Sequence, residues 1–142
     1  MRQTATVLLI DDDTDDQEML LRVFEELGVK NPVIIFDKSV KLLGYLVNTK
    51  ETIFLILCDV NMPGVNGIEL RRIINDDSFL RTKSIPFVFY TTAAVQHEVN
   101  EAYEMMVQGY FEKPHEYEKI KATIKIIIDY WRISIHPNNW RG

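Results

Sequence analysis

The alternation of short apolar runs with amphipathic segments constrains the fold of this chain more than any other feature. The apolar runs are typical of strands buried on both faces of a sheet, and they lie at about 5–10, 33–36, 53–58, 85–90 and 110–111. Segments with apolar residues at helical spacing lie at about 14–27, 39–47, 67–74, 95–106 and 116–134. Five strands that alternate with five helices predict an α/β fold, with a doubly wound five-stranded parallel sheet and helices on both faces.

The length and composition of the chain favour one domain. It has 142 residues, 46% of them hydrophobic, and it lacks a linker rich in Gly, Ser or Pro. We expect a single domain over 1–142, with a core at about 5–134 and a C-terminal tail at 135–142. Thr14 is a candidate cap for the first helix, and the polar stretch 76–84 is interpreted as a connection only.

Charge, cysteine content and hydropathy narrow the class of protein. A formal net charge of −5 without clustered Lys and Arg argues against nucleic acid as a partner. Cys58 is the only cysteine, which excludes an internal disulfide and favours a role as core filling. The first residues lack the apolar stretch of a secretory signal, and the run 53–58 is too short to span a bilayer. We therefore expect a soluble cytoplasmic protein that does not enter membranes.

Polar and charged residues follow four of the five predicted strands. They are Asp11, Asp12 and Asp13 after the first strand, Asp59 after the third, Thr91 and Thr92 at the fourth, and Lys113 with Pro114 after the fifth. Because the carboxyl ends of parallel strands meet at one edge of a sheet, these side chains should form one acidic pocket.

Such a pocket requires positive charge. Close carboxylates repel each other by about 4 kcal/mol per pair at an effective dielectric constant near 20. Oxygen ligands without a nearby His or Cys favour Mg²⁺ or Mn²⁺ over zinc, and Lys113 adds a second, fixed positive charge. His97, His115 and His136 share no ligand spacing and are expected at the surface.

Four segments, LLIDDD, LCDVNMPGVNG, FYTTA and YFEKP, resemble the response-regulator receiver family in order and spacing, and the resemblance runs from Val7 to Trp131. It implies a flavodoxin-like sheet in which Asp59 accepts a phosphoryl group. Asp11 and Asp12 would organise the metal ion together with Asp59 and the backbone carbonyl of Asn61.

The same resemblance assigns the signalling residues. Thr91 would be the switch hydroxyl, Tyr110 the switch aromatic, and Lys113 would contact the phosphoryl oxygens. The phosphoryl group would come from a sensor histidine kinase or a phosphotransfer protein and the signal would pass to an unknown downstream protein. The chain would catalyse only its own phosphorylation and dephosphorylation. The triple aspartate and the DYW near the end of the last helix also resemble single-domain receivers that partner phytochromes.

One departure from the common receiver pattern concerns the lifetime of the acyl phosphate. Ala93, two residues after Thr91, cannot orient an attacking water through a polar side chain, whereas Asn61 can. The lifetime therefore stays open in both directions. Asp13, Asp15 and Asp16 are interpreted as residues that only favour the start of the first helix.

Two other functions compete with this interpretation. A haloacid-dehalogenase phosphatase also uses an aspartate nucleophile beside Mg²⁺, but its Asp-x-Asp-x-Thr motif would place Thr where Asp15 stands. A receiver-like binding module without phosphorylation would be expected to lack an acid or the lysine, and all are present here.

The last predicted helix has two apolar faces. One face holds Ile120, Ile124, Ile127 and Trp131, and the other holds Ile126, Tyr130 and Ile133. A sheet can cover only one of them. Either the tail at 136–140 folds back over the second face, or that face forms a homodimer contact, and both alternatives stay open.

Overall fold

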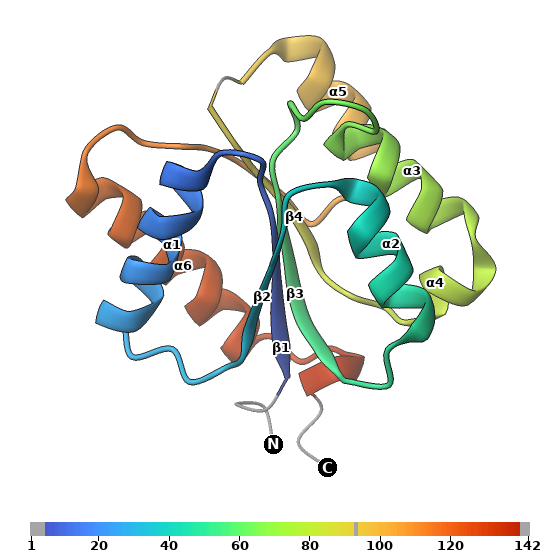
Figure 1. Cartoon of the computed structure of the whole chain (residues 1–142), viewed down its shortest axis with the longest axis horizontal. Helices are drawn as coiled ribbons and strands as arrows, with labels where there is room; N and C mark the ends of the chain where they lie inside the picture. The colour runs from blue at the N-terminus through green and yellow to red at the C-terminus, as the bar shows by residue number, and fades with distance from the viewer. Residues whose placement is uncertain (1–4, 93, 140–142) are drawn as a thin grey trace.

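Five parallel strands form one sheet in the computed structural model, which describes residues 5–92 and 94–139. Their order is β2-β1-β3-β4-β5, which makes β2 and β5 the edges (Figure 1). The strands are β1 (Thr6–Ile10), β2 (Val33–Phe36), β3 (Ile53–Cys58), β4 (Phe87–Thr91) and β5 (Gly109–Glu112). The predicted flavodoxin-like, doubly wound parallel sheet is confirmed.

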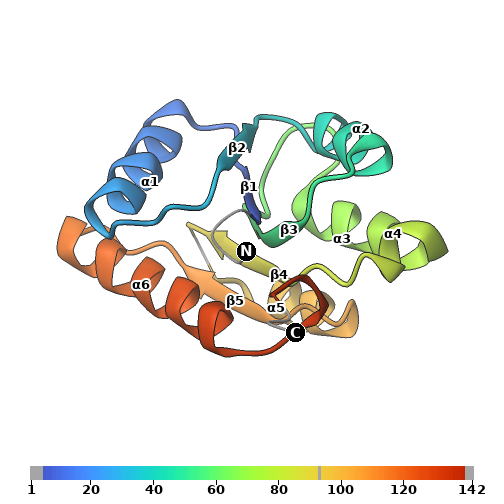
Figure 2. The same ribbon diagram turned by 90° about the horizontal axis from the view of Figure 1, so that it is seen from below.

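Helices cover both faces of the sheet. One face carries α1 (Thr14–Glu26) and α6 (Tyr117–Ile133) (Figure 1, Figure 2). The other carries α2 (Ser39–Asn48), α3 (Gly67–Asp76), α4 (Ser78–Thr82) and α5 (Gln96–Glu104). No helix in the described ranges has both the length and the apolar character that a membrane crossing requires.

The core consists of two apolar clusters, one on each face of the sheet. Side chains of a strand alternate between the faces, so Leu8 and Ile10 pack towards α2 and α3 while Leu9 packs towards α1 and α6. In β3, however, Phe54 and Leu55 both face α1 and α6. The register between β1 and β3 shifts at this point, which places one extra residue of β3 on that face.

Two predicted details of the helices are wrong. Asp13, not Thr14, caps α1, because its carboxylate accepts a hydrogen bond from the backbone N–H of Asp16 at 3.0 Å. The stretch 76–84 is more than a connection, since it contains the short helix α4. Asp77 caps α4, and Leu80 within α4 is buried against the core. These two features explain why so polar a stretch folds as a helix.

The C-terminal tail folds under the amino end of the sheet. The ring of His136 lies 6.0 Å from that of Phe54 and 5.6 Å from that of Trp131 between centroids. A short 3-10 helix follows at Pro137–Asn139, where the side-chain amide of Asn138 donates to the carbonyl of Lys83 at 2.9 Å. His136 is therefore half-buried, not a surface residue.

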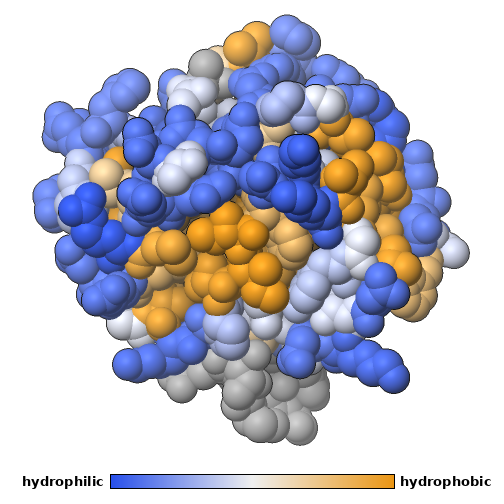
Figure 3. Space-filling view, viewed as in Figure 1, coloured by the Kyte–Doolittle hydropathy of each residue, from blue (hydrophilic) through white to orange (hydrophobic). Residues whose placement is uncertain are grey.

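The tail leaves the second face of α6 open. Ile126, Tyr130 and Ile133 are 63%, 60% and 81% exposed. Of the two alternatives, the fold-back of the tail over this face does not hold for the described residues, and Trp140 lies outside them. A separate apolar surface occupies the centre and right of Figure 3, over the edge strand β2 and over α2, where Val40 and Val47 are exposed.

Candidate functional site

The carboxyl edge of the sheet brings the predicted site residues together. The sheet hydrogen bonding continues one residue past two strands: Asp11 N–H donates to the carbonyl of Phe36, and Asp59 N–H donates to that of Ile10. Both acids are therefore fixed by the ladder itself. Thr91 ends β4, and Lys113 follows β5 directly.

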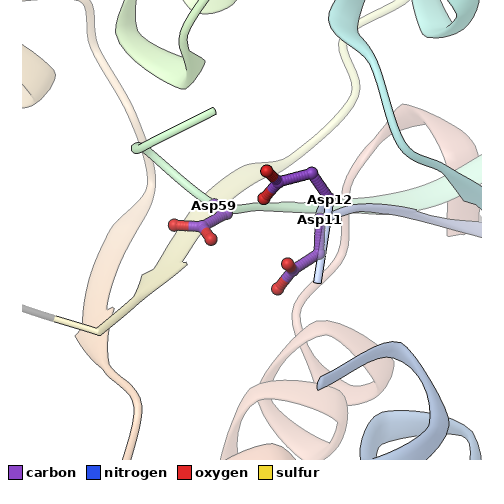
Figure 4. A group of neighbouring side chains, drawn as sticks. All are labelled: Asp11, Asp12 and Asp59. Atoms are coloured by element: carbon purple, nitrogen blue, oxygen red, sulfur yellow. The ribbon is translucent and has the colours of Figure 1, made fainter. Parts of the chain in front are cut away.

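Three carboxylates converge at this edge (Figure 4). Asp11, Asp12 and Asp59 each offer one oxygen, and these oxygens lie within 4.8 Å of one another. Asp11 and Asp59 are buried, whereas Asp12 is exposed, so the group opens to solvent on one side. An all-oxygen donor set with an open side fits a hard divalent cation that keeps some of its waters.

Lys113 supplies positive charge to these acids. Its side chain is 7% exposed, and its ammonium contacts Asp11 at 2.7 Å, Asp16 at 2.8 Å and Asp59 at 3.3 Å. Burial alone would lower the pKa of Lys113, but the hydrogen bonds to Asp11 and Asp16 and the negative charges of Asp11 and Asp59 together outweigh burial and raise that pKa. Lys113 therefore stays charged throughout the physiological range.

Burial makes the charged form of Asp11 less stable. Burial raises the pKa of Asp11, and the hydrogen bonds from Lys113 and from the backbone N–H of Asp13 offset that rise only in part. The charged carboxylate is thus less favourable at this position than in water. A second cation beside Lys113 would relieve the imbalance.

Thr91 is fully buried and already engaged with Asp59. Its hydroxyl donates to Oδ1 of Asp59 at 2.7 Å, and its carbonyl accepts from the backbone N–H of Lys113 at 2.6 Å. The backbone N–H of Asn61 donates to the same Asp59 oxygen at 3.3 Å. One oxygen of Asp59 therefore receives two donors, while the other lies nearest the ammonium of Lys113.

Tyr110 lies on the α5 side of the sheet, half-buried. It pairs in register with Phe89, and the two ring centroids are 5.7 Å apart. Its hydroxyl is buried without a hydrogen-bond partner among the described residues. Burial, followed by the charges of Glu98 and Asp59, raises the pKa of Tyr110.

Two residues at the site were not identified from the sequence as contributing to it. Gly67 donates its N–H to the carbonyl of Val60, and a Cβ at Gly67 would collide with the carbonyl oxygen of Asp59. Asp16 was interpreted only as a helix-start residue, yet it holds Lys113. No pattern in the sequence distinguishes it from Asp13 and Asp15, because its contact with Lys113 depends on how α1 leaves the sheet.

The remaining candidates divide clearly. Cys58 is buried as expected, and burial raises the pKa of its thiol well above the usual range. His97 and His115 are exposed. Ala93, on which the lifetime of an acyl phosphate was argued, lies outside the described residues.

Comparison with known proteins identifies the family of the chain. The family model of the response regulator receiver domain matches residues 7–125. The chemotaxis protein CheY of Pseudomonas aeruginosa is 28% identical over 123 residues, which cover 87% of this chain and 95% of CheY.

Solved structures share the fold. The phosphorylated cyanobacterial phytochrome response regulator RcpA superposes with a TM-score of 0.83 at 22% identity, covering 94% of this chain and 97% of that one. The Mn²⁺-bound form of response regulator Rcp1 gives 0.81 at 23% identity, covering 93% and 97%. The fold is therefore that of phytochrome response regulators among others.

Proposed function

The chain belongs to the response regulator receiver family of two-component signalling, and we propose that Asp59 is the residue that accepts its phosphoryl group. The observation that carries this assignment is the position of Asp59, which lies beside the Lys113 ammonium and among the carboxylates that would hold a divalent cation. The ammonium of Lys113 lies 3.3 Å from one oxygen of Asp59, and an oxygen of Asp59 lies within 4.8 Å of oxygens of Asp11 and Asp12. A phosphatase of the haloacid-dehalogenase kind is not favoured.

Asp11, Asp12 and Asp59, with the backbone carbonyl of Asn61, would hold the divalent cation. We propose Mg²⁺ or Mn²⁺, since the donor set is all oxygen and the similar Rcp1 was solved with Mn²⁺. When bound, the cation would neutralise carboxylate charge and charge on the incoming phosphoryl group. The three carboxylates carry −3, and a divalent cation with Lys113 supplies +3.

The residues of this chain would then position the reacting groups and screen their negative charges. An oxygen of Asp59 attacks phosphorus, a new O–P bond forms, and the bond from phosphorus to the donor's nitrogen or oxygen breaks. Lys113 contacts a phosphoryl oxygen and screens its charge. Phosphorylation replaces a carboxylate charge of −1 by about −2, and hydrogen bonds to the phosphoryl oxygens meet the excess.

Mass spectrometry tests the assignment. Incubation with acetyl phosphate and Mg²⁺ should add one phosphoryl group, and Asp59→Asn should abolish the addition. Asp129→Asn, a change at an exposed pair on α6, is the matched control and should be labelled like wild type. Full labelling of Asp59→Asn, or labelling undiminished in EDTA, would contradict the proposal.

Thr91 is proposed to couple the site to the rest of the molecule. A charge-assisted hydrogen bond contributes about 1.5–3 kcal/mol, whereas a swing from 1:99 to 99:1 needs about 5.5 kcal/mol. Lys113 and loop N–H groups would therefore have to supply the rest of the free energy that shifts the conformational equilibrium. Thr91→Ala should keep Asp59 labelling but weaken the amide shifts that beryllofluoride induces around Tyr110. Unchanged shifts would exclude coupling through this hydroxyl.

The partners follow from the chemistry of the family. A sensor histidine kinase or a phosphotransfer protein in the cytoplasm would donate the phosphoryl group, and a downstream protein would read the result. Pull-downs with and without beryllofluoride distinguish partners of the two states.

The open face of α6 supports a homodimer as part of this function. Exposed apolar residues that recur on one helical face are typical of a contact surface. Tyr130→Glu or Ile133→Glu should shift sedimentation towards monomer at about tens of micromolar. Val40→Glu changes the separate apolar surface over α2, so it tests whether a dimer uses that surface instead of α6. A wild-type monomer, or dispersal by Val40→Glu alone, would remove the α6 interface.

A further inference from the structure

Lys113 is held by an acid that does not belong to the metal group. Its ammonium has three N–H donors and faces three carboxylates, those of Asp11, Asp16 and Asp59. Only Asp11 and Asp59 also belong to the set of converging oxygens that fits a cation. Asp16 approaches Lys113 from α1, and its side chain is 38% exposed.

The arrival of a cation changes these three contacts unequally. A bound divalent ion would neutralise part of the negative charge of Asp11 and Asp59, and it would repel the ammonium of Lys113. Both effects weaken the hold of the metal ligands on the lysine. Asp16 keeps its whole charge, so it becomes the principal anchor of Lys113 when the site is loaded.

Local structure fixes Asp16 for this task. Its backbone N–H is held by the carboxylate of Asp13, which caps α1. The neighbouring Gln17 ties the same turn to the carbonyl of Asp11 at 2.6 Å. The start of α1 is therefore fastened to the end of β1, and the carboxylate of Asp16 is carried to Lys113 on a rigid element.

We propose that Asp16 is a positioning residue for phosphoryl transfer: it holds the Lys113 ammonium beside Asp59 when a divalent cation occupies the adjoining carboxylates. The inference rests on the proposed function of Asp59. A carboxylate in the first helical turn also stabilises a helix through the macrodipole. Asp15 does the same from an exposed position, so Asp15→Asn is the matched control.

Phosphorylation kinetics at saturating Mg²⁺ provide the test. Asp16→Asn should lower the rate constant for labelling by acetyl phosphate about ten-fold. This factor corresponds to the lower end of the free energies that charge-assisted hydrogen bonds contribute. Asp15→Asn should change it less than about two-fold. In a Lys113→Met background, Asp16→Asn should have no further effect, because its role requires the ammonium.

Two outcomes would overturn the inference: a loss in Asp16→Asn equal to that in Asp15→Asn, or an undiminished loss in the Lys113→Met background. Nitrogen-15 NMR of the Lys113 ammonium with Mg²⁺ alone provides a second readout, and its signal should shift in Asp16→Asn but not in Asp15→Asn. Failure of wild type to be labelled would refute the phosphoacceptor proposal. The ammonium signal would then still decide whether Asp16 holds Lys113.

Discussion

The two ends of the sheet differ in their buried side chains, which are charged at the carboxyl end and aromatic at the amino end. At the carboxyl end, Asp11, Asp59 and Lys113 are buried together. At the amino end, Phe54 and Trp131 pack against the ring of His136. The first end concentrates charge whose burial is unfavourable without a bound cation, and the second supplies apolar burial that stabilises the domain. Function and stability are thus separated by the length of a strand.

The largest effect is expected at the amino end. Phe54→Ala should lower the free energy of unfolding by about 3–5 kcal/mol, because it empties a fully buried aromatic site. Denaturant unfolding measures this, and Ile135→Ala, at a half-exposed tail residue, should change stability by less than about 0.5 kcal/mol. The rate of Asp59 labelling in the folded fraction should not change. A slower rate there would mean that the two ends are not separate.

Mg²⁺ should stabilise the carboxyl end next. At free Mg²⁺ one hundred times its dissociation constant, the free energy of unfolding should rise by about 2.7 kcal/mol. The rise should be largely lost in Asp59→Asn and kept in Phe54→Ala. Thermal melts with Mg²⁺ and with EDTA measure it, and an equal rise in Asp59→Asn would place the cation elsewhere.

In EDTA, removal of an acid should stabilise the protein. Burial raises the pKa of Asp11 in the folded state above its unfolded value, so its contribution to stability is present below the unfolded pKa and is lost as pH rises through the folded pKa. Asp11→Asn should therefore be more stable than wild type at neutral pH. The difference should shrink as the pH falls through the raised folded pKa of Asp11, and it should be lost below about pH 4. A variant less stable than wild type at pH 7 would show that Lys113 compensates the charge fully.

The smallest effect concerns the tail. Asn138→Ala removes the hydrogen bond to the carbonyl of Lys83 and should lower the free energy of unfolding by about 0.5–1.5 kcal/mol. Asn48 also donates its amide to a backbone carbonyl, but from an exposed position, so Asn48→Ala should have almost no effect. Equal losses in both variants would indicate that the tail does not contribute to the amino end.

Hydrophobic periodicity was sufficient to predict the sheet and its helices, because each β–α unit is specified locally. It was insufficient for α4, where one cap and one buried leucine outweigh a polar composition. The convergence of Asp11, Asp12 and Asp59 was also predictable, since the ends of parallel strands must meet.

The contact between Asp16 and Lys113 was not predictable in this way. It depends on how α1 leaves the sheet, and therefore on side-chain direction instead of strand order. The same holds for the tail, whose docking below β3 follows from ring contacts of His136 that no period in the sequence encodes.

Among the described residues, the buried hydroxyl of Tyr110 has no hydrogen-bond partner. A buried phenol without a partner forfeits about 1–3 kcal/mol, and a buried oxygen of Glu98 is likewise unpaired among the described residues. Any rearrangement that hydrates or pairs these groups recovers this free energy. A rearrangement of this corner of the sheet that pairs both groups would therefore draw part of its driving force from the hydroxyl of Tyr110 itself.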